Sequence, residues 1–214
     1  MKIRPQFDAY QNCYKNYNHK FEWLSFFDFD EFLEFRYKGM TIKEFLKKKK
    51  FEKCQDIKIN WIIYGNDNSL LYENKPLKER FNVAEPYNLD NKHIKTTVRG
   101  NLSINYWNDM ETPHTSSSNK FISCSSSGEI ISSSSPFNYP PEYKYAYLKH
   151  YRFKSFEEFC IKIKRERSDF TLKENKNNTI ELIKNLYLQN KGNDKKLKII
   201  KSIFKEEFLS FESK

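Results

Sequence analysis

The segment Leu24-Ser-Phe-Phe-Asp-Phe-Asp30 joins an apolar, aromatic run to two aspartates. A short apolar run that ends in acidic residues predicts a buried strand leading into a loop. Because side chains alternate along an extended chain, Asp28 and Asp30 would project to the same side, roughly 6.6 Å apart along the backbone. One divalent cation fits between two such carboxylates, since magnesium and manganese prefer oxygen ligands. A solvated acidic loop after a core strand has the same spacing, so the surrounding residues must decide between the two.

Regular elements of both kinds are predicted around and after this segment. Residues 56–65, DIKINWIIYG, alternate apolar residues with polar or edge positions and end at a Gly-Asn turn, which predicts a strand. Thr41-Ile-Lys-Glu44 and Ser155-Phe-Glu-Glu158 are capping boxes that predict a short helix over 41–50 and an amphipathic helix after Ser155. Further elements are predicted at 93–99 and 143–151 (strands), 76–81 (helical turns opened by Pro76), 178–190 and 194–209 (helices). Strands that alternate with helices predict an α/β layer architecture.

The region 112–141 lacks such periodicity. Its serines are concentrated in the runs 116–118, 125–127 and 132–135. We expect a flexible loop there, with 129–131 as a candidate strand. Lys and Asn dominate the end of the chain, so we divide it into a domain of residues 1–170 and a basic helical tail of residues 171–214 that the domain does not need.

The net charge of the 214 residues is +10, which is compatible with nucleic acid, an anionic membrane surface or phosphorylated substrates as partners. The basic residues are scattered apart from the run 47–50 and the stretch 144–167. They accompany no helix-turn-helix, zinc-finger spacing or RNA-binding aromatic motif, so we expect no nucleic-acid partner. Peripheral contact of the basic residues with a membrane stays open beside a solvated helix face.

The four cysteines stand far apart in the sequence and form no Cys-x-x-Cys pair. They are Cys13, Cys54, Cys124 and Cys160. Without a second cysteine or histidine at metal-binding spacing, neither a zinc site nor a redox motif is indicated, and we expect reduced thiols. No window reaches the apolar length of a signal peptide or a membrane span, so we expect a soluble protein in the cytoplasm, with the membrane surface as an open alternative.

The residues around the two aspartates resemble a known family. Trp23 to Phe32 resembles the W, D-x-DEF signature of glycosyltransferase family 92 and of related family-2-like enzymes, preceded by Gln11 and Cys13 on a predicted helix. Further blocks follow in the family's order: Trp61 with Tyr64-Gly65, Arg80-Phe81, Lys92 to Arg99, Pro113-His114, and His150 to Phe159 with Lys162 and Arg165. The resemblance covers residues 8–170, and the order of the six blocks is more specific than any one block.

Two features depart from the family pattern. The nucleotide-binding half that precedes the signature in the family has no counterpart before Gln11, so the chain resembles a family member truncated at its N-terminus. The closing Arg-Gly of the last block reads Arg165-Glu166, which puts in doubt a close backbone approach that only glycine allows.

The resemblance implies a partial GT-A fold, a mixed sheet flanked by helices with a helical C-terminal tail. The implied activity is transfer of a hexose from a nucleotide-diphosphate sugar to a glycan or lipid-linked acceptor, with manganese or magnesium as cofactor. Asp28 and Asp30 would bind the metal, with Asp30 the more direct ligand, and His150 would be a further ligand. Glu31 would adjust the loop or assist the acceptor. A histidine beside a tyrosine also occurs simply as a packed residue, so both roles for His150 stay open.

Other residues have weaker claims to a role. Arg99 and Lys154 are candidates for contact with donor phosphates, and Asp169 for a base on the acceptor hydroxyl, although an Asp after a basic helix also serves as a helix cap. His114 is a weaker candidate in the serine-rich loop. The tryptophans are assigned to the core (Trp23 and Trp61) or to a candidate sugar platform (Trp107).

Three function classes therefore compete. The first is the glycosyltransferase, which would turn over little donor if its nucleotide-binding strands are missing. The second is a non-catalytic remnant that acts as an interaction module. The third is a basic binder of membranes or nucleic acid, which requires the cations to gather on one face.

Overall fold

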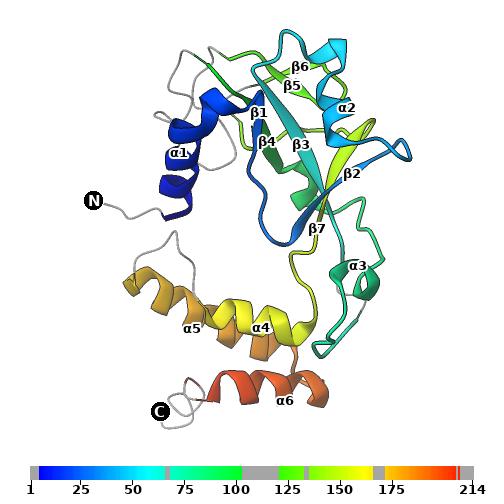
Figure 1. Ribbon diagram of the computed structural model, residues 1–214. Helices are drawn as coiled ribbons and strands as arrows, with labels where there is room; N and C mark the ends of the chain where they lie inside the picture. The colour runs from blue at the N-terminus through cyan, green and yellow to red at the C-terminus, as the bar shows by residue number, and fades with distance from the viewer. Residues whose placement is uncertain are drawn as a thin grey trace. The chain divides into compact units, whose positions relative to one another are not determined.

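The computed structural model describes residues 5–65, 68–102, 121–132, 135–165, 172–205 and 207. The chain divides into two compact units (Figure 1). We call residues 6–63 and 84–150 the sheet unit, and residues 1–5, 64–83 and 151–214 the helical unit. Each unit is described by itself below.

The sheet unit is built on a mixed sheet of seven strands. The strands are β1 (Trp23–Ser25), β2 (Glu31–Phe35), β3 (Asp56–Ile63), β4 (Ile94–Arg99), β5 (Ser123–Ser125), β6 (Ile130–Ile131) and β7 (Ala146–His150). The main path runs β1-β4-β3-β5-β6, while β7 joins β3 and β2 joins β7. β3 pairs with β4 in antiparallel fashion and with both β5 and β7 in parallel fashion. The predicted α/β class with a mixed sheet is therefore confirmed.

The long strand β3 lies at the centre of this sheet, and all eight of its residues are buried. Its first half pairs with β4 and β5, and its second half pairs with β7. The predicted strand is confirmed, and its polar side chains are buried together with the apolar ones, because a central strand that is covered on both faces buries both kinds.

Short helices complete the sheet unit: α1 (Pro5–Tyr17), α2 (Ile42–Leu46) and the 3-10 turns η1 (Asn18–Lys20), η2 (Lys49–Phe51) and η3 (Leu89–Lys92). The capping box at α2 is confirmed. The Glu44 N–H donates to Thr41 Oγ1 at 3.2 Å, and Thr41 N–H donates to Glu44 Oε2 at 2.8 Å. α2 ends four residues earlier than predicted, and η2 begins at Lys49, near the end of the predicted range.

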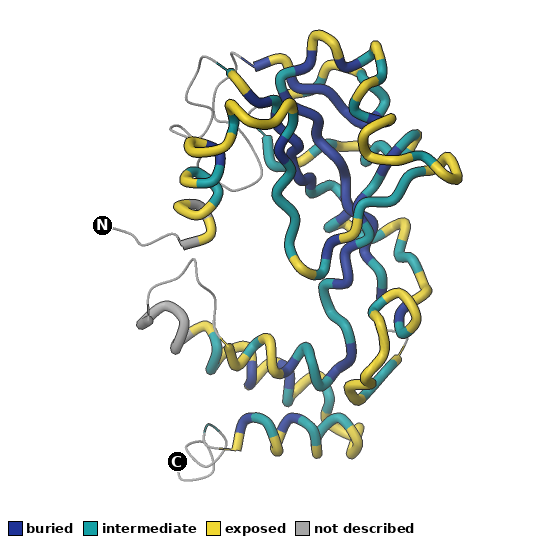
Figure 2. Tube along the Cα trace, viewed as in Figure 1, coloured by how far each residue is buried: buried dark blue, intermediate teal, exposed yellow. Residues whose placement is uncertain are grey.

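The helical unit contains α3 (Leu77–Arg80), α4 (Phe156–Lys164), α5 (Leu172–Gln189) and α6 (Asp194–Ile203). α4, α5 and α6 share one apolar core, visible as dark blue segments in Figure 2. This core consists of Phe156, Cys160, Ile183, Leu186, Ile200 and Phe204. The predicted domain boundary at residue 170 lies between α4 and α5, two helices that share this core.

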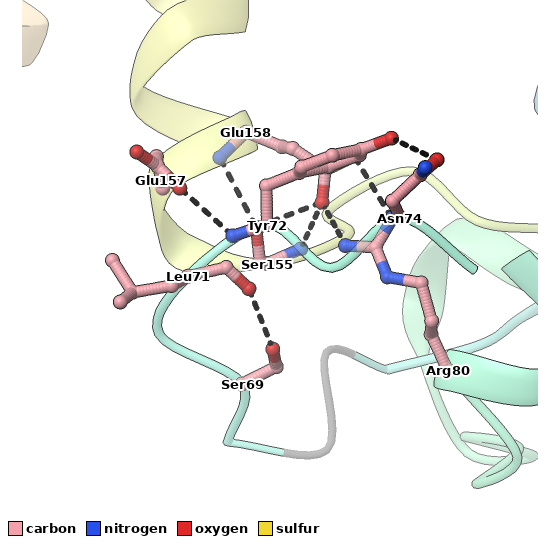
Figure 3. A network of polar contacts seen from close by, with 8 residues as sticks. All are labelled: Ser69, Leu71, Tyr72, Asn74, Arg80, Ser155, Glu157 and Glu158. Atoms are coloured by element: carbon pink, nitrogen blue, oxygen red, sulfur yellow. Dashed lines mark hydrogen bonds and ion pairs between the residues drawn. The ribbon is translucent and has the colours of Figure 1, made fainter.

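A polar network joins the start of α4 to residues 69–80 (Figure 3). Ser155 forms the predicted capping box, because its hydroxyl accepts the Glu158 N–H while Glu158 Oε2 accepts the Ser155 N–H. The Arg80 guanidinium pairs with Glu158, and Glu157 Oε2 accepts the Tyr72 N–H at 2.8 Å. Two of the sequence blocks that resemble the family, Arg80-Phe81 and the Glu-Glu pair of α4, therefore meet in a contact that stabilises the unit.

The serine-rich region contains a strand that the sequence did not predict. In β5 and just after it, Ser123, Ser125 and Ser126 are buried, and the Ser126 hydroxyl donates to Glu142 at 2.7 Å. The expected flexible loop is wrong for these residues, which are buried in and beside β5. Small hydroxyls fit such a position when they find hydrogen-bond partners, as those of Ser125 and Ser126 do. The candidate strand at 129–131 is confirmed as β6, while the serine run 116–118 lies outside the described residues.

Cys54 and Cys124 form a disulfide, with their Cα atoms 5.9 Å apart. The expectation of four reduced thiols is therefore wrong, although Cys13 and Cys160 are free. The pairing of β3 with β5 brings the two cysteines together from positions 70 residues apart, a long-range contact that their spacing does not reveal. None of the helices in the described ranges is long and apolar enough to span a membrane.

Candidate functional site

The turn between β1 and β2 carries the two aspartates of the motif. β1 ends at Ser25 and β2 begins at Glu31, so neither Asp28 nor Asp30 lies on a strand. The turn is closed in both directions: Glu31 N–H donates to Asp28 O at 3.0 Å, and Asp28 N–H donates to Glu31 Oε2 at 2.9 Å. Phe29 is fully exposed at its tip. The predicted strand alternation does not apply here, and the two carboxylates have different partners.

Asp28 is bound by side chains from β4 and α1. Its Oδ2 lies 2.9 Å from the Lys95 ammonium. Its Oδ1 accepts hydrogen bonds from Gln6 Nε2 at 2.9 Å and from the Tyr10 hydroxyl at 3.3 Å. The carboxylate therefore ties the turn to two other elements of the sheet unit.

Lys95 and Glu31 are both fully buried beneath the turn, with their charged atoms 3.5 Å apart. Burial opposes the charge on Lys95, but the carboxylates of Glu31 and Asp28 outweigh it and raise the pKa of this lysine. Burial raises the pKa of Glu31 to about 7, although Lys95 acts in the opposite direction. Sequence reasoning missed Lys95 as a site residue. A lysine between β-branched and apolar strand residues was the available signal, because lysine is rarely fully buried unless paired.

Asp30 faces His150 at the end of β7, with Asp30 Oδ1 and His150 Nε2 3.7 Å apart. The register of β2 and β7 explains this, because Glu31 lies directly opposite His150. The His150 ring packs on Trp61 with ring centroids 4.2 Å apart. The other contacts of Trp61 include a stack with His93, 4.8 Å between centroids. The structure thus brings together two of the predicted site residues, Asp30 and His150.

The separation of Asp30 and His150 is compatible with a shared divalent cation. Two ligands that each lie about 2.1 Å from an ion are up to about 4.2 Å apart. Magnesium is commonly held by one or two carboxylates, with substrate phosphates and water completing its shell. In the described part of the chain, no group of three or more His, Cys, Asp or Glu side chains is arranged to hold a metal. A cation here would therefore depend on oxygens from a substrate or from water.

The other predicted site residues are placed differently. Arg99 donates to Phe51 O and Cys54 O at 2.9 and 3.0 Å, and its guanidinium lies over the Trp23 ring. Its hydrogen bonds thus support the loop before β3. Lys154 belongs to the helical unit, where its backbone adopts a left-handed conformation with φ of 53°.

Some predictions about individual residues are tested by the structure and others are not. Asp169, His114 and Trp107 lie outside the described residues. Among the other tryptophans, Trp61 is buried in the core as predicted, whereas Trp23 is only partly buried under Arg99.

The chain matches the family model described as glycosyltransferase family 92 over residues 1–190, which extends past the resemblance seen in the sequence and includes α5. The comparison with curated proteins gave no match. Because the matched region spans most of the chain and contains both the turn of residues 28–31 and His150, the chain belongs to glycosyltransferase family 92.

Proposed function

We propose that this glycosyltransferase transfers a hexose from a nucleotide-diphosphate sugar to a glycan or lipid-linked acceptor and uses manganese or magnesium to do so. The observation that carries the proposal is the Asp30–His150 pair, a carboxylate and an imidazole 3.7 Å apart in a family member. The pair would hold the cation from one side and leave the opposite side for the diphosphate. Carboxylate oxygen suits both metals, and imidazole nitrogen is an acceptable ligand for manganese.

When bound, the metal would supply positive charge where negative charge develops on the departing diphosphate. Asp30 and His150 would fix the position of that charge. Glu31 is too deeply buried to contact a substrate, so of its two predicted roles the geometry supports adjustment of the turn. Its carboxyl also holds the Asp28 N–H at one end of the turn. A donor contact by Arg99 or Lys154 and a base role for Asp169 stay predictions.

Calorimetry with manganese and UDP tests the metal site. The wild-type chain should bind manganese in the presence of UDP, while Asp30→Ala and His150→Ala should each reduce the affinity at least tenfold. Asp90→Ala is a matched control, because Asp90 also lies near a histidine, 4.0 Å from His93, and should change nothing. Equal heats for the wild type and Asp30→Ala would disprove the site.

Release of UDP from UDP-glucose and UDP-galactose tests the transfer. Metal-dependent release that Asp30→Ala abolishes would support the enzyme. Manganese binding without any release would instead favour the alternative, a non-catalytic family member that acts as an interaction module.

The disulfide gives information about the cellular compartment of the protein. Disulfides persist in oxidising compartments and are rare in the cytosol. The Cys54–Cys124 bond therefore favours an oxidising compartment over the cytoplasm expected from the sequence. Alkylation of thiols in cell extracts, before and after reduction, decides this: Cys54 and Cys124 should react only after reduction, and prompt reaction would restore the cytoplasmic expectation.

A further inference from the structure

Asp28, the first aspartate of the motif, is paired with a positively charged side chain, that of Lys95. Three hydrogen-bond donors converge on the Asp28 carboxylate, from Lys95, Gln6 and Tyr10. An ionised carboxylate has about four lone-pair sites, so three donors occupy most of its capacity. A metal ion that approached Asp28 would have to displace these partners and would meet the positive charge of Lys95.

Lys95 cannot contact a substrate in this arrangement, because its side chain is fully buried. Its ammonium instead contacts both ends of the turn, Asp28 at 2.9 Å and Glu31 at 3.5 Å. The two reciprocal hydrogen bonds between Asp28 and Glu31 close the same turn. Lys95 therefore holds the two ends of the turn together.

The positions of Asp28 and Glu31, the two ends of the turn, determine where Asp30 lies. Glu31 is the first residue of β2 and is fixed opposite His150 by the pairing of β2 with β7. Asp28 is fixed to β4 and α1 through Lys95, Gln6 and Tyr10. With residues 28 and 31 both held, residue 30 has little freedom, and its carboxylate faces His150.

We propose that Lys95 is a positioning residue whose buried ammonium binds Asp28 and Glu31, so that Asp30, and not Asp28, is the aspartate of the motif that serves the metal. This inference rests on the proposed function for its metal, and it assigns different roles to the two aspartates. Asp28 anchors the turn to Lys95, and Asp30 is presented to the cation together with His150.

Metal affinity in matched variants tests the division of labour. Asp28→Asn keeps the size of the side chain and an oxygen that can accept a hydrogen bond, but it weakens the anchor to Lys95, so it should reduce the manganese affinity less than Lys95→Met does. Asp30→Asn should reduce that affinity at least tenfold. Lys95→Met should reduce it about 10- to 100-fold, the usual range for residues that orient metal ligands. Lys75→Met, which breaks the exposed Lys75–Glu73 pair, is the control and should have no effect.

Hydrogen exchange tests the positioning role without any metal. In Lys95→Met the amides of Asp28 and Glu31, which close the turn, should exchange faster than in the wild type. The double variant Lys95→Met/Asp28→Asn removes both charges of the pair and should recover part of the protection, so a general failure to fold is distinguishable from a displaced turn.

The possible failures point to different conclusions. Unchanged exchange at these amides in Lys95→Met would overturn the positioning role, whatever the metal data show. An equal loss of affinity in Asp28→Asn and Asp30→Asn would overturn the division of labour. If neither aspartate affects manganese binding, the metal site of the proposed function fails, and the exchange data alone decide the role of Lys95.

Discussion

Both units have apolar cores, but they differ in how many polar side chains they bury. Among the described residues, every buried polar or charged residue but Ser155 belongs to the sheet unit. These include the charged side chains of Glu31, Asp56, Lys58 and Lys95. The helical unit buries an apolar cluster of aromatic and aliphatic side chains from α4, α5 and α6, and Ser155 is its one buried polar residue among those described.

The difference matches what each unit has to do. A buried charge is costly unless it is paired, but a satisfied polar network holds its members in one geometry. The sheet unit uses such pairs around the turn of residues 28–31, where position matters for chemistry. The helical unit gains its stability from apolar burial, which is less directional. We therefore expect truncation to damage the helical unit most, and loss of single polar partners to have smaller, local effects.

The largest effect should come from ending the chain at Phe170. This removes Ile183, Leu186, Ile200 and Phe204 from the apolar core. Each such side chain contributes about 1.5–3 kcal/mol when buried, so the helical unit should lose its cooperative unfolding. The family-like region seen in the sequence suggests the opposite, that residues after 170 are dispensable.

Thermal unfolding followed by circular dichroism, with proteolysis of the region 151–170, distinguishes the two expectations. A chain ending at residue 207 keeps the whole core and is the control. If the chain ending at Phe170 unfolds as cooperatively as the control, the core of the helical unit is not what stabilises it.

The second effect concerns the one strong ion pair of the helical unit among the described residues, Arg80 with Glu158. Only 4% of the Arg80 side chain and 18% of the Glu158 side chain are exposed. Arg80→Met should cost about 3–5 kcal/mol of unfolding free energy, because it leaves a largely buried carboxylate without its cation. Arg80→Met/Glu158→Gln should cost less than the single change, and urea denaturation measures both.

The pair also predicts a pH dependence. Burial of Glu158 acts to raise its pKa, but Arg80 and Ser155 outweigh burial and the pKa is lowered. A lowered pKa in the folded state stabilises the protein above the ordinary glutamate pKa, and this stabilisation is lost as the pH falls through the lowered value. The difference in stability between wild type and Arg80→Met should therefore shrink below about pH 4. A difference that is constant down to pH 2 would contradict the ion pair.

Much of this fold was predictable because its signals are local. Both capping boxes, the β3 segment and the strands near His93 and Tyr143 follow from short-range patterns, and the structure confirms them. β5 was missed because serine and cysteine are weak strand signals, and only pairing with β3 makes them a buried strand. The disulfide was missed for the same reason.

At the candidate site, too, local patterns were predictable and long-range contacts were not. The sequence drew attention to Asp30 and His150, and the structure places them 3.7 Å apart. The sequence could not show that Asp28 binds Lys95, because this contact joins positions 67 residues apart and depends on the tertiary packing of β4 near the turn. Residue type and local spacing identify candidates, whereas tertiary pairing decides which of them share a partner.

The third effect concerns the disulfide of the sheet unit. Reduction, or Cys54→Ser with Cys124→Ser, should lower the stability of this unit by about 2–4 kcal/mol, because a crosslink over 70 residues restricts the unfolded chain. Hydrogen exchange with and without reductant, read separately for β3 and α4, measures it. Protection in α4 should not change, since Cys160 there is a free thiol. Equal loss of protection in both units would show that they unfold together.

The smallest effect compares two helix caps that share one chemistry but lie in different units. Thr41 with Glu44 and Ser155 with Glu158 both form capping boxes. An N-cap change to alanine costs about 0.5–2 kcal/mol. Thr41→Ala should lie near the lower end, because Thr41 and Glu44 are exposed and water can replace the lost bond. Ser155→Ala should lie near the upper end, because Ser155 is fully buried and its hydroxyl also donates to the carboxylate that pairs with Arg80. Urea denaturation of the two variants gives the ratio directly, and equal costs would mean that the network around Glu158 adds nothing to the cap.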